Sequence, residues 1–165
     1  MANVSVNFDT LKGKHPNYQH IRSMIGGELG RFMVGKETCA VQVSYALNHS
    51  AAVIEAFSFA DPSLHGGKVR ALESNDGFFY IFGVPDMKVY LNNRYGLAEN
   101  YKGSKNTMIE NIKGRRGILA FGHRHIDLWE GERFHWQQLY RDLWGFDSVK
   151  VRGVFFWEVT SEWGF

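Results

Sequence analysis

The chain has 165 residues, of which 44% are hydrophobic and 22% charged, a composition typical of one folded domain with a buried core. Its 19 basic and 17 acidic side chains give a formal net charge of +2, so it lacks the clustered basic excess of most nucleic-acid-binding proteins. No run of about 18 apolar residues is present, which excludes a membrane-spanning helix. A single cysteine excludes an intrachain disulfide and any zinc site with several cysteines. We expect synthesis in the cytoplasm without a secretory signal, because no basic stretch followed by an apolar one opens the chain.

Glycine and proline delimit the elements expected near the start. A short amphipathic helix is predicted around Phe8 to Leu11, closed by Gly13 and Pro16. The stretch 24–35 is rich in both glycine and apolar residues. Because glycine permits positive φ angles, this pattern predicts a buried connection rather than a regular element.

The middle of the chain contains clear helix and strand signals. Thr38 is a favourable N-cap and apolar residues then recur at helical spacing, which predicts a helix from Cys39 to about Asn48. The aromatic run 77–82 predicts a buried strand. Pro85 at a first helical position and Gly96 beyond the last one predict a helix between them.

The second half predicts mainly strands. Residues 99–105 are polar and predict a loop. Residues 137–144 predict a helix. Three segments predict strands, namely 118–121, 125–129 and 149–159. Since helices come first and strands later, the fold class is predicted to be α+β, a single domain over residues 1–165 with helices packed on an antiparallel sheet.

Cys39 is the first candidate for chemistry. A lone cysteine is often a small buried hydrophobic residue. At the first turn of a helix, however, unpaired backbone N–H groups and the helix dipole favour the thiolate, which is the nucleophilic form. The same N–H groups can hold an oxyanion. Cys39 is therefore predicted to be a nucleophile, provided that a base lies nearby.

Histidine supplies the candidate base, in the sequence His123-x-His125-x-Asp127. Strict alternation predicts that His125, Asp127 and Trp129 share one strand face, where Trp129 can exclude water and Asp127 can contact a substrate. Two alternatives are a merely polar strand face and a zinc site that combines these residues with Cys39 or His135. A cysteine at a helix start followed far downstream by a histidine on a strand fits the papain-like order best.

Several segments resemble one known family. The stretches TCAVQVSYALNHS, FFYIFGVPDMKVYL, KGRRGILAF and HIDLWEG, with MIGGELG ahead of the cysteine, are similar in type and order to the type VI secretion amidase effectors of family four. The resemblance runs from about Phe8 to Gly131, and residues 132–165 carry none.

The resemblance implies a papain-like, NlpC-type cysteine peptidase that cleaves the γ-D-glutamyl–meso-diaminopimelate bond of peptidoglycan stem peptides. It places the family nucleophile on Cys39 and the family histidine on His125, and it implies no cofactor. It further implies an antibacterial toxin that a type VI tube or spike component delivers from the producer's cytoplasm into the periplasm of a target cell. A cognate immunity protein is the implied protein partner.

The sequence departs from the family pattern in two places. The link between the strand at 118–121 and the histidine strand is only Gly122-His123-Arg124, shorter than usual in the family. The family's third catalytic residue is an aspartate about a dozen positions after the histidine, where this chain has no carboxylate. We predict that His135 orients His125 instead, with Gln137 as an alternative, and that Asp127 does not reach the ring. The missing aspartate leaves a second hypothesis open, a non-catalytic papain-like binding module for peptidoglycan or a protein partner.

Overall fold

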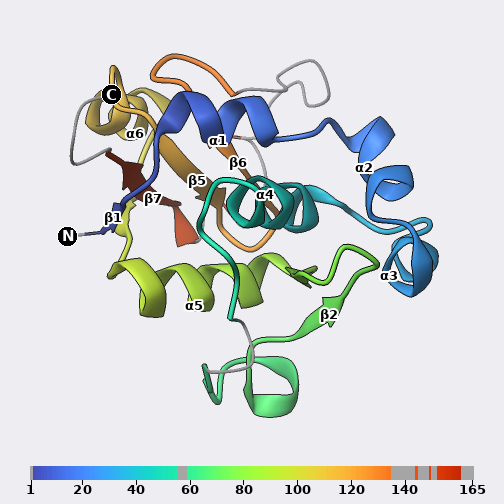
Figure 1. The fold of residues 1–165 in the computed structure, drawn as a ribbon. Coiled ribbons are helices and arrows are strands. Elements are labelled where there is room, and N and C mark those ends of the chain that lie inside the picture. Colours follow the sequence, from blue (N-terminus) through green and yellow to red (C-terminus); the bar gives the residue numbers. More distant parts are fainter. Residues whose placement is uncertain (1, 56–58, 135–143, 145–148, 150–151, 161–165) are drawn as a thin grey trace. The chain divides into compact units, whose positions relative to one another are not determined.

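The computed structural model describes residues 2–55, 59–134, 144, 149 and 152–160. The chain forms two compact units, one of residues 1–8 with 91–165 and one of residues 9–90. In chain order the helices and strands shown in Figure 1 are β1 (Asn3–Val4), α1 (Phe8–Lys14), α2 (Tyr18–Ile25), α3 (Gly27–Phe32), α4 (Cys39–Asn48), β2 (Ala71–Glu73), β3 (Phe79–Ile81), α5 (Val84–Tyr95), β4 (Glu99–Tyr101), α6 (Lys105–Ile112), β5 (Gly117–Phe121), β6 (His125–Trp129) and β7 (Val154–Val159).

A five-stranded sheet forms the centre of the unit that contains residues 91–165. Strand β7 pairs antiparallel with β5 along one edge, and on the other edge it pairs antiparallel with β4 and parallel with β1. Strand β6 pairs antiparallel with β5. The α+β class is confirmed, but the sheet is mixed rather than antiparallel. The difference arises at β1, a two-residue strand whose partner lies more than 150 residues away and leaves no local sequence signal.

Strands β5 and β6, both predicted, pair as a hairpin. All ten of their residues are buried, and Gly122, with a φ of 53°, allows the tight turn between them. One face of the sheet packs into a cluster that includes Leu119, Phe121, Trp129 and Phe156. Full burial explains why β5 reads as a continuous apolar run. The predicted strand 149–159 is shorter in the structure, where β7 begins only after Gly153.

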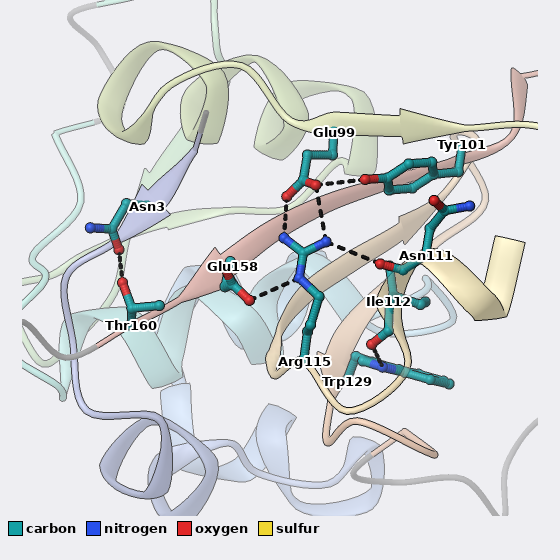
Figure 2. Close-up of polar contacts among 9 residues, drawn as sticks. All are labelled: Asn3, Glu99, Tyr101, Asn111, Ile112, Arg115, Trp129, Glu158 and Thr160. Atoms are coloured by element: carbon teal, nitrogen blue, oxygen red, sulfur yellow. Dashed lines mark hydrogen bonds and ion pairs between the residues drawn. The ribbon is translucent and has the colours of Figure 1, made fainter. Parts of the chain in front are cut away.

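Arg115 and the two carboxylates that it pairs with form a cluster that links strands β4 and β7 of this sheet (Figure 2). Arg115 donates to Glu99 on β4 at 2.6 and 3.0 Å and to Glu158 on β7 at 2.9 Å. Tyr101 donates to the same Glu99 carboxylate at 2.6 Å. The hydrogen bonds from Arg115 keep the pKa of Glu99 below its usual value. Residues 99–105 were predicted as a loop, which is wrong, because β4 and the Ser104 cap of α6 occupy this stretch.

The unit of residues 9–90 is mainly helical. Helix α1 confirms the prediction for the first element, and α4 has the predicted bounds. The predicted buried connection at 24–35 is wrong, since α2 and α3 fill most of it. Gly26 separates the two helices with a φ of 55°, and a side chain on Gly27 would overlap Asn75. Gly26 and Gly27 therefore form a sharp junction between two helices. The high glycine content of this stretch led to the prediction of an irregular connection instead.

A short antiparallel hairpin, β2–β3, accompanies these helices. Its turn is closed by Asp76, which accepts hydrogen bonds from Ser74 at 2.6 Å and from the Phe78 backbone at 3.0 Å, and also from the Tyr80 hydroxyl. Burial and this carboxylate both raise the pKa of Tyr80. Helix α5 follows as predicted.

The remaining predictions about organisation have different outcomes. The helix predicted at 137–144 lies almost entirely outside the described residues. Among the residues that are described, no helix is both long and apolar enough to cross a membrane. The single-domain prediction stays a prediction.

Candidate active site

Cys39 is the first residue of α4, as predicted, and only 5% of it is exposed. The backbone N–H groups of a first helical turn have no partner within the helix. Thr38 occupies the N-cap position but makes no side-chain capping bond. Its hydroxyl instead donates to the Gln42 side chain at 2.9 Å, and Gln42 donates to the Pro16 carbonyl at 2.9 Å. The Thr38 side chain therefore does not bond to the backbone N–H groups in the first turn of α4. These groups lie beside the only thiol in the sequence.

Two further polar residues fix α4 against the hairpin. The Ser44 hydroxyl is bonded to both the backbone nitrogen and the carbonyl of Ile81, at 3.0 and 3.1 Å. Asn48 donates to the Phe79 carbonyl at 2.8 Å and accepts from the Ile54 backbone at 2.9 Å. These residues replace a neighbouring strand along the outer edge of β3, so they hold the cysteine helix at a fixed position on the hairpin.

Sequence reasoning missed Gln42, Ser44 and Asn48. A signal was present, because Ser44 and Asn48 lie four residues apart on a helix that is otherwise largely apolar. Residues at this spacing share one helix face. Polar side chains on a face expected to be buried require hydrogen-bond partners, and the backbone edge of a strand supplies them.

His125 and Asp127 lie together on β6, and both are buried. His125 Nε2 is 3.2 Å from Asp127 Oδ2, while Asp127 Oδ1 accepts from the Leu128 backbone at 2.8 Å. The prediction that Asp127 does not reach the ring is wrong. Residues two apart on a strand face are about 7 Å apart, and side chains that lean along the strand close that gap.

The contact with Asp127 sets the protonation of the histidine ring. A carboxylate only accepts hydrogen bonds, so a neutral His125 carries its proton on Nε2. Nδ1 is then the basic nitrogen. A carboxylate that holds one ring nitrogen in this way orients the imidazole of a general base.

Trp129 does not lie where a substrate-binding residue is expected. Only 2% of it is exposed, and its indole nitrogen donates to the Ile112 carbonyl at 3.1 Å. Its ring packs against Phe134 with centroids 5.3 Å apart. Trp129 is thus a core residue of the described structure, and the prediction that it contacts substrate stays a prediction.

The candidates that the structure describes form no metal site among themselves. His123 is exposed in the turn between β5 and β6, and His135 lies outside the described residues. In the described part of the chain, no group of three or more histidine, cysteine or acidic side chains could hold a metal ion. Cys39 belongs to the unit of residues 9–90 and His125 to the other unit, so their pairing stays a prediction.

Comparison with known proteins identifies relatives of this chain. The Tae4 family model, described as type VI secretion system amidase effector protein 4, matches residues 36–157. A crystal structure of Tae4 from Salmonella typhimurium, in complex with the immunity protein Tai4 from Enterobacter cloacae, is 22% identical. The match has a TM-score of 0.71 and covers 94% of this chain and 99% of that one. Tae4 from Enterobacter cloacae is 19% identical with a TM-score of 0.67, covering 97% of this chain and 100% of that one. A comparison with curated proteins gave no match.

Proposed function

The chain belongs to the Tae4 family of type VI secretion amidase effectors, and we propose that it is a papain-like cysteine amidase that cleaves the γ-D-glutamyl–meso-diaminopimelate bond of peptidoglycan stem peptides. The observation that carries this proposal is the buried His125–Asp127 pair, at 3.2 Å, in a chain whose only cysteine begins a helix. Cys39, His125 and Asp127 are the residue types that supply a nucleophile, a base and an orienting carboxylate.

In the first chemical step, the Cys39 thiolate attacks the carbon of the scissile amide. The carbonyl oxygen becomes an oxyanion, which the first-turn N–H groups of α4 stabilise. His125 gives its proton to the leaving nitrogen, the C–N bond breaks, and the amine product departs. The acyl half of the substrate remains on Cys39 as a thioester.

In the second step, His125 takes a proton from a water molecule, which attacks the thioester carbon. The C–S bond breaks, the carboxylic acid product leaves, and the thiolate is restored. Asp127 acts through His125, because its carboxylate orients the ring and stabilises the imidazolium form. His135 remains the alternative orienting residue.

The family also suggests where the enzyme acts and what restrains it. We propose delivery by a type VI secretion apparatus into the periplasm of a target cell, where the enzyme degrades peptidoglycan. Several of the matching Tae4 structures, from Salmonella typhimurium and Enterobacter cloacae, are complexes with Tai4 proteins, which supports a cognate immunity protein as the partner of this chain.

The test is digestion of purified sacculi, with mass spectrometry of the released peptides. We expect the wild-type protein to release fragments cut at the γ-D-glutamyl bond, and Cys39→Ala to lose several orders of magnitude in rate. Fragments released at the parental rate by Cys39→Ala would overturn the proposal.

Alkylation by iodoacetamide separates an enzyme from a binding module. A thiolate activated by His125 should react faster than a free thiol, and His125→Ala should slow this reaction. His20→Ala is the matched control, since His20 is exposed on α2. Equal alkylation rates in the wild type and in both variants would favour the binding module.

A further inference from the structure

The segment that leads into the cysteine helix, residues 33–38, is held by an arginine of another helix. The segment opens with a turn in which the Lys36 N–H donates to the Met33 carbonyl at 3.0 Å, and Gly35 has a positive φ of 73°. Arg22, on α2, donates from Nε to the Met33 carbonyl at 3.0 Å and from Nη2 to the Lys36 carbonyl at 2.6 Å. Its guanidinium therefore binds both ends of the turn. The catalytic steps proposed above give Arg22 no role.

The shape of the guanidinium explains why an arginine occupies this position. Its N–H groups form a rigid planar fork, so one side chain can hold two acceptors at a fixed separation. A lysine ammonium carries the same charge on a flexible stem and lacks this geometry. Among the described residues, every side-chain hydrogen bond of Arg22 goes to the turn 33–36.

The turn is close to Cys39 along the chain. Because a trans peptide is planar, the Arg22 bond to the Lys36 carbonyl also fixes the direction of the Glu37 N–H. Only Glu37 lies between this peptide and Thr38, the N-cap residue of α4. A change in the direction of the 36–37 peptide would therefore shift the first turn of α4, where Cys39 lies.

A second contact reaches the first turn of α4 from the start of the same helix, α2. The Pro16 carbonyl, two residues before α2 begins at Tyr18, accepts from the Gln42 side chain at 2.9 Å. Gln42 in turn accepts from the Thr38 hydroxyl at 2.9 Å. The buried side chains of α2 pack in a core cluster that includes Val41 of α4. Pro16 and α2 thus support both the turn before α4 and the first turn of α4 itself.

These contacts matter because a nucleophile must be placed accurately. A displacement of about 1 Å can lower the rate of an enzyme reaction about 100-fold. We propose that Arg22 is a positioning residue, whose guanidinium holds the turn 33–36 and thereby sets the position of the Cys39 thiol. This inference rests on the proposed function for the reaction that the thiol performs. Since Arg22 acts through the backbone, its loss should affect the chemical step more than substrate binding.

Steady-state cleavage of a soluble stem peptide that contains the γ-D-glutamyl–meso-diaminopimelate bond separates shape from charge. Arg22→Lys keeps the charge but loses the fork, and Arg22→Gln loses both. We expect each variant to lower kcat about 10-fold or more, with KM within about 2-fold of the wild-type value. Arg31→Lys, at an exposed position on α3, is the matched control and should keep the wild-type kcat. A wild-type kcat in Arg22→Lys would overturn the inference, because charge alone would then suffice.

A glycine substitution tests the turn with Arg22 intact, and also serves if the Arg22 variants fail to fold. At Gly35, with φ at 73°, an added Cβ meets no described atom within 4 Å beyond its chain neighbours, so Gly35→Ala introduces backbone strain without a clash. We expect kcat to fall about 3-fold. Gly66→Ala imposes a similar strain at a φ of 81°, also in open space, and should leave kcat unchanged. Equal kcat values in these two variants would overturn the inference.

Hydrogen–deuterium exchange of the amides in residues 33–41 gives a readout that does not depend on turnover. Exchange there should be about 10-fold faster in Arg22→Lys and unchanged in Arg31→Lys. A merely structural role for Arg22 would instead speed exchange throughout residues 9–90 and lower the melting temperature, and unchanged exchange in 33–41 would likewise overturn the inference. Faster local exchange with no cleavage by the wild type would overturn the amidase proposal and keep Arg22 as the support of Cys39. Cleavage by the wild type and equally by Arg22→Lys would overturn the role of Arg22 alone.

Discussion

The helix that carries Cys39 and the sheet that carries His125 are held by different chemistry. Helix α4 is fixed to its hairpin by neutral side chains, Ser44 and Asn48, which are buried and bond to backbone groups. The edge of the sheet is fixed by Arg115, whose side chain is 26% exposed and pairs with two carboxylates.

This difference predicts how each region responds to change. Neutral buried hydrogen bonds do not titrate, but removing one partner leaves the other unsatisfied, at a cost of about 1–3 kcal/mol. Ion pairs near the surface depend on pH and salt, and each contributes about 1 kcal/mol or less. The cysteine helix should therefore be sensitive to mutation, and the sheet edge to solution conditions.

The largest effect should come from Asp127. Its side chain is a carboxyl group, as at the sheet edge, but it is buried, as Ser44 and Asn48 are. Asp127→Ala should lower kcat by two to four orders of magnitude, because the ring of His125 loses its orientation and its imidazolium loses a counter-charge. KM for a soluble stem peptide should stay within about 2-fold. A merely structural role would instead change the melting temperature and KM together.

The same assay decides between Asp127 and His135. If His135→Ala lowers turnover about tenfold while Asp127→Ala leaves it unchanged, the orienting role belongs to His135. In that case activity should fall on the acid side, near the ordinary histidine pKa of about 6.5, as His135 becomes protonated.

The second effect is on stability, at Asn48. Asn48→Ala removes two hydrogen bonds and leaves the Phe79 carbonyl and the Ile54 N–H without this partner. We expect the free energy of unfolding to fall by about 2–3 kcal/mol in urea titrations. Asn111→Ala is the matched control on an exposed face of α6 and should change stability by less than about 0.5 kcal/mol. Equal losses in the two variants would contradict the anchoring role of Asn48.

A smaller effect is expected at Arg115. Arg115→Gln removes the ion pairs to Glu99 and Glu158, and the partial exposure of the three side chains limits the loss to about 1 kcal/mol at pH 7. Added salt should reduce the difference in the free energy of unfolding between this variant and the wild type, because it screens exposed charges. Arg31→Gln, an exposed position on α3, should show neither the loss nor the salt dependence.

The smallest effect is the pH dependence of the same cluster. The pKa of Glu99 is lowered in the folded protein, chiefly by its hydrogen bonds from Arg115. A lowered folded pKa adds stability above the unfolded value, about 4.5, and this contribution disappears as the pH falls through the folded pKa. Urea unfolding between pH 7 and 3 should therefore show a shallower acid loss in Arg115→Gln than in the wild type. Parallel curves would contradict this assignment.

Elements with strong local signals could be predicted from the sequence. Thr38 and the apolar spacing after it define α4, Pro85 and Gly96 define α5, and the apolar and alternating runs define β5 and β6. In each case the determinants lie within the element itself or next to it.

The unpredicted parts depend on distant partners. Strands β1, β2 and β4 have two or three residues each, and β1 and β4 exist because β7, far along the chain, pairs with them. The contact between His125 and Asp127 depends on how two side chains lean along one strand. The alternating pattern predicts that the two side chains share a face of the strand, but not that they come within hydrogen-bond distance of each other.

Strand β7 has a further consequence for how the sheet can be assembled. Among the strands that the structure describes, it is the last in the chain and also the one that joins the others, with β5 on one edge and β1 and β4 on the other. While the chain is being synthesised, β1 and β4 emerge from the ribosome long before residues 154–159. The sheet that contains His125 can thus close only after residues 154–159 have been translated, and shortening the chain before residue 154 removes the strand that joins the others.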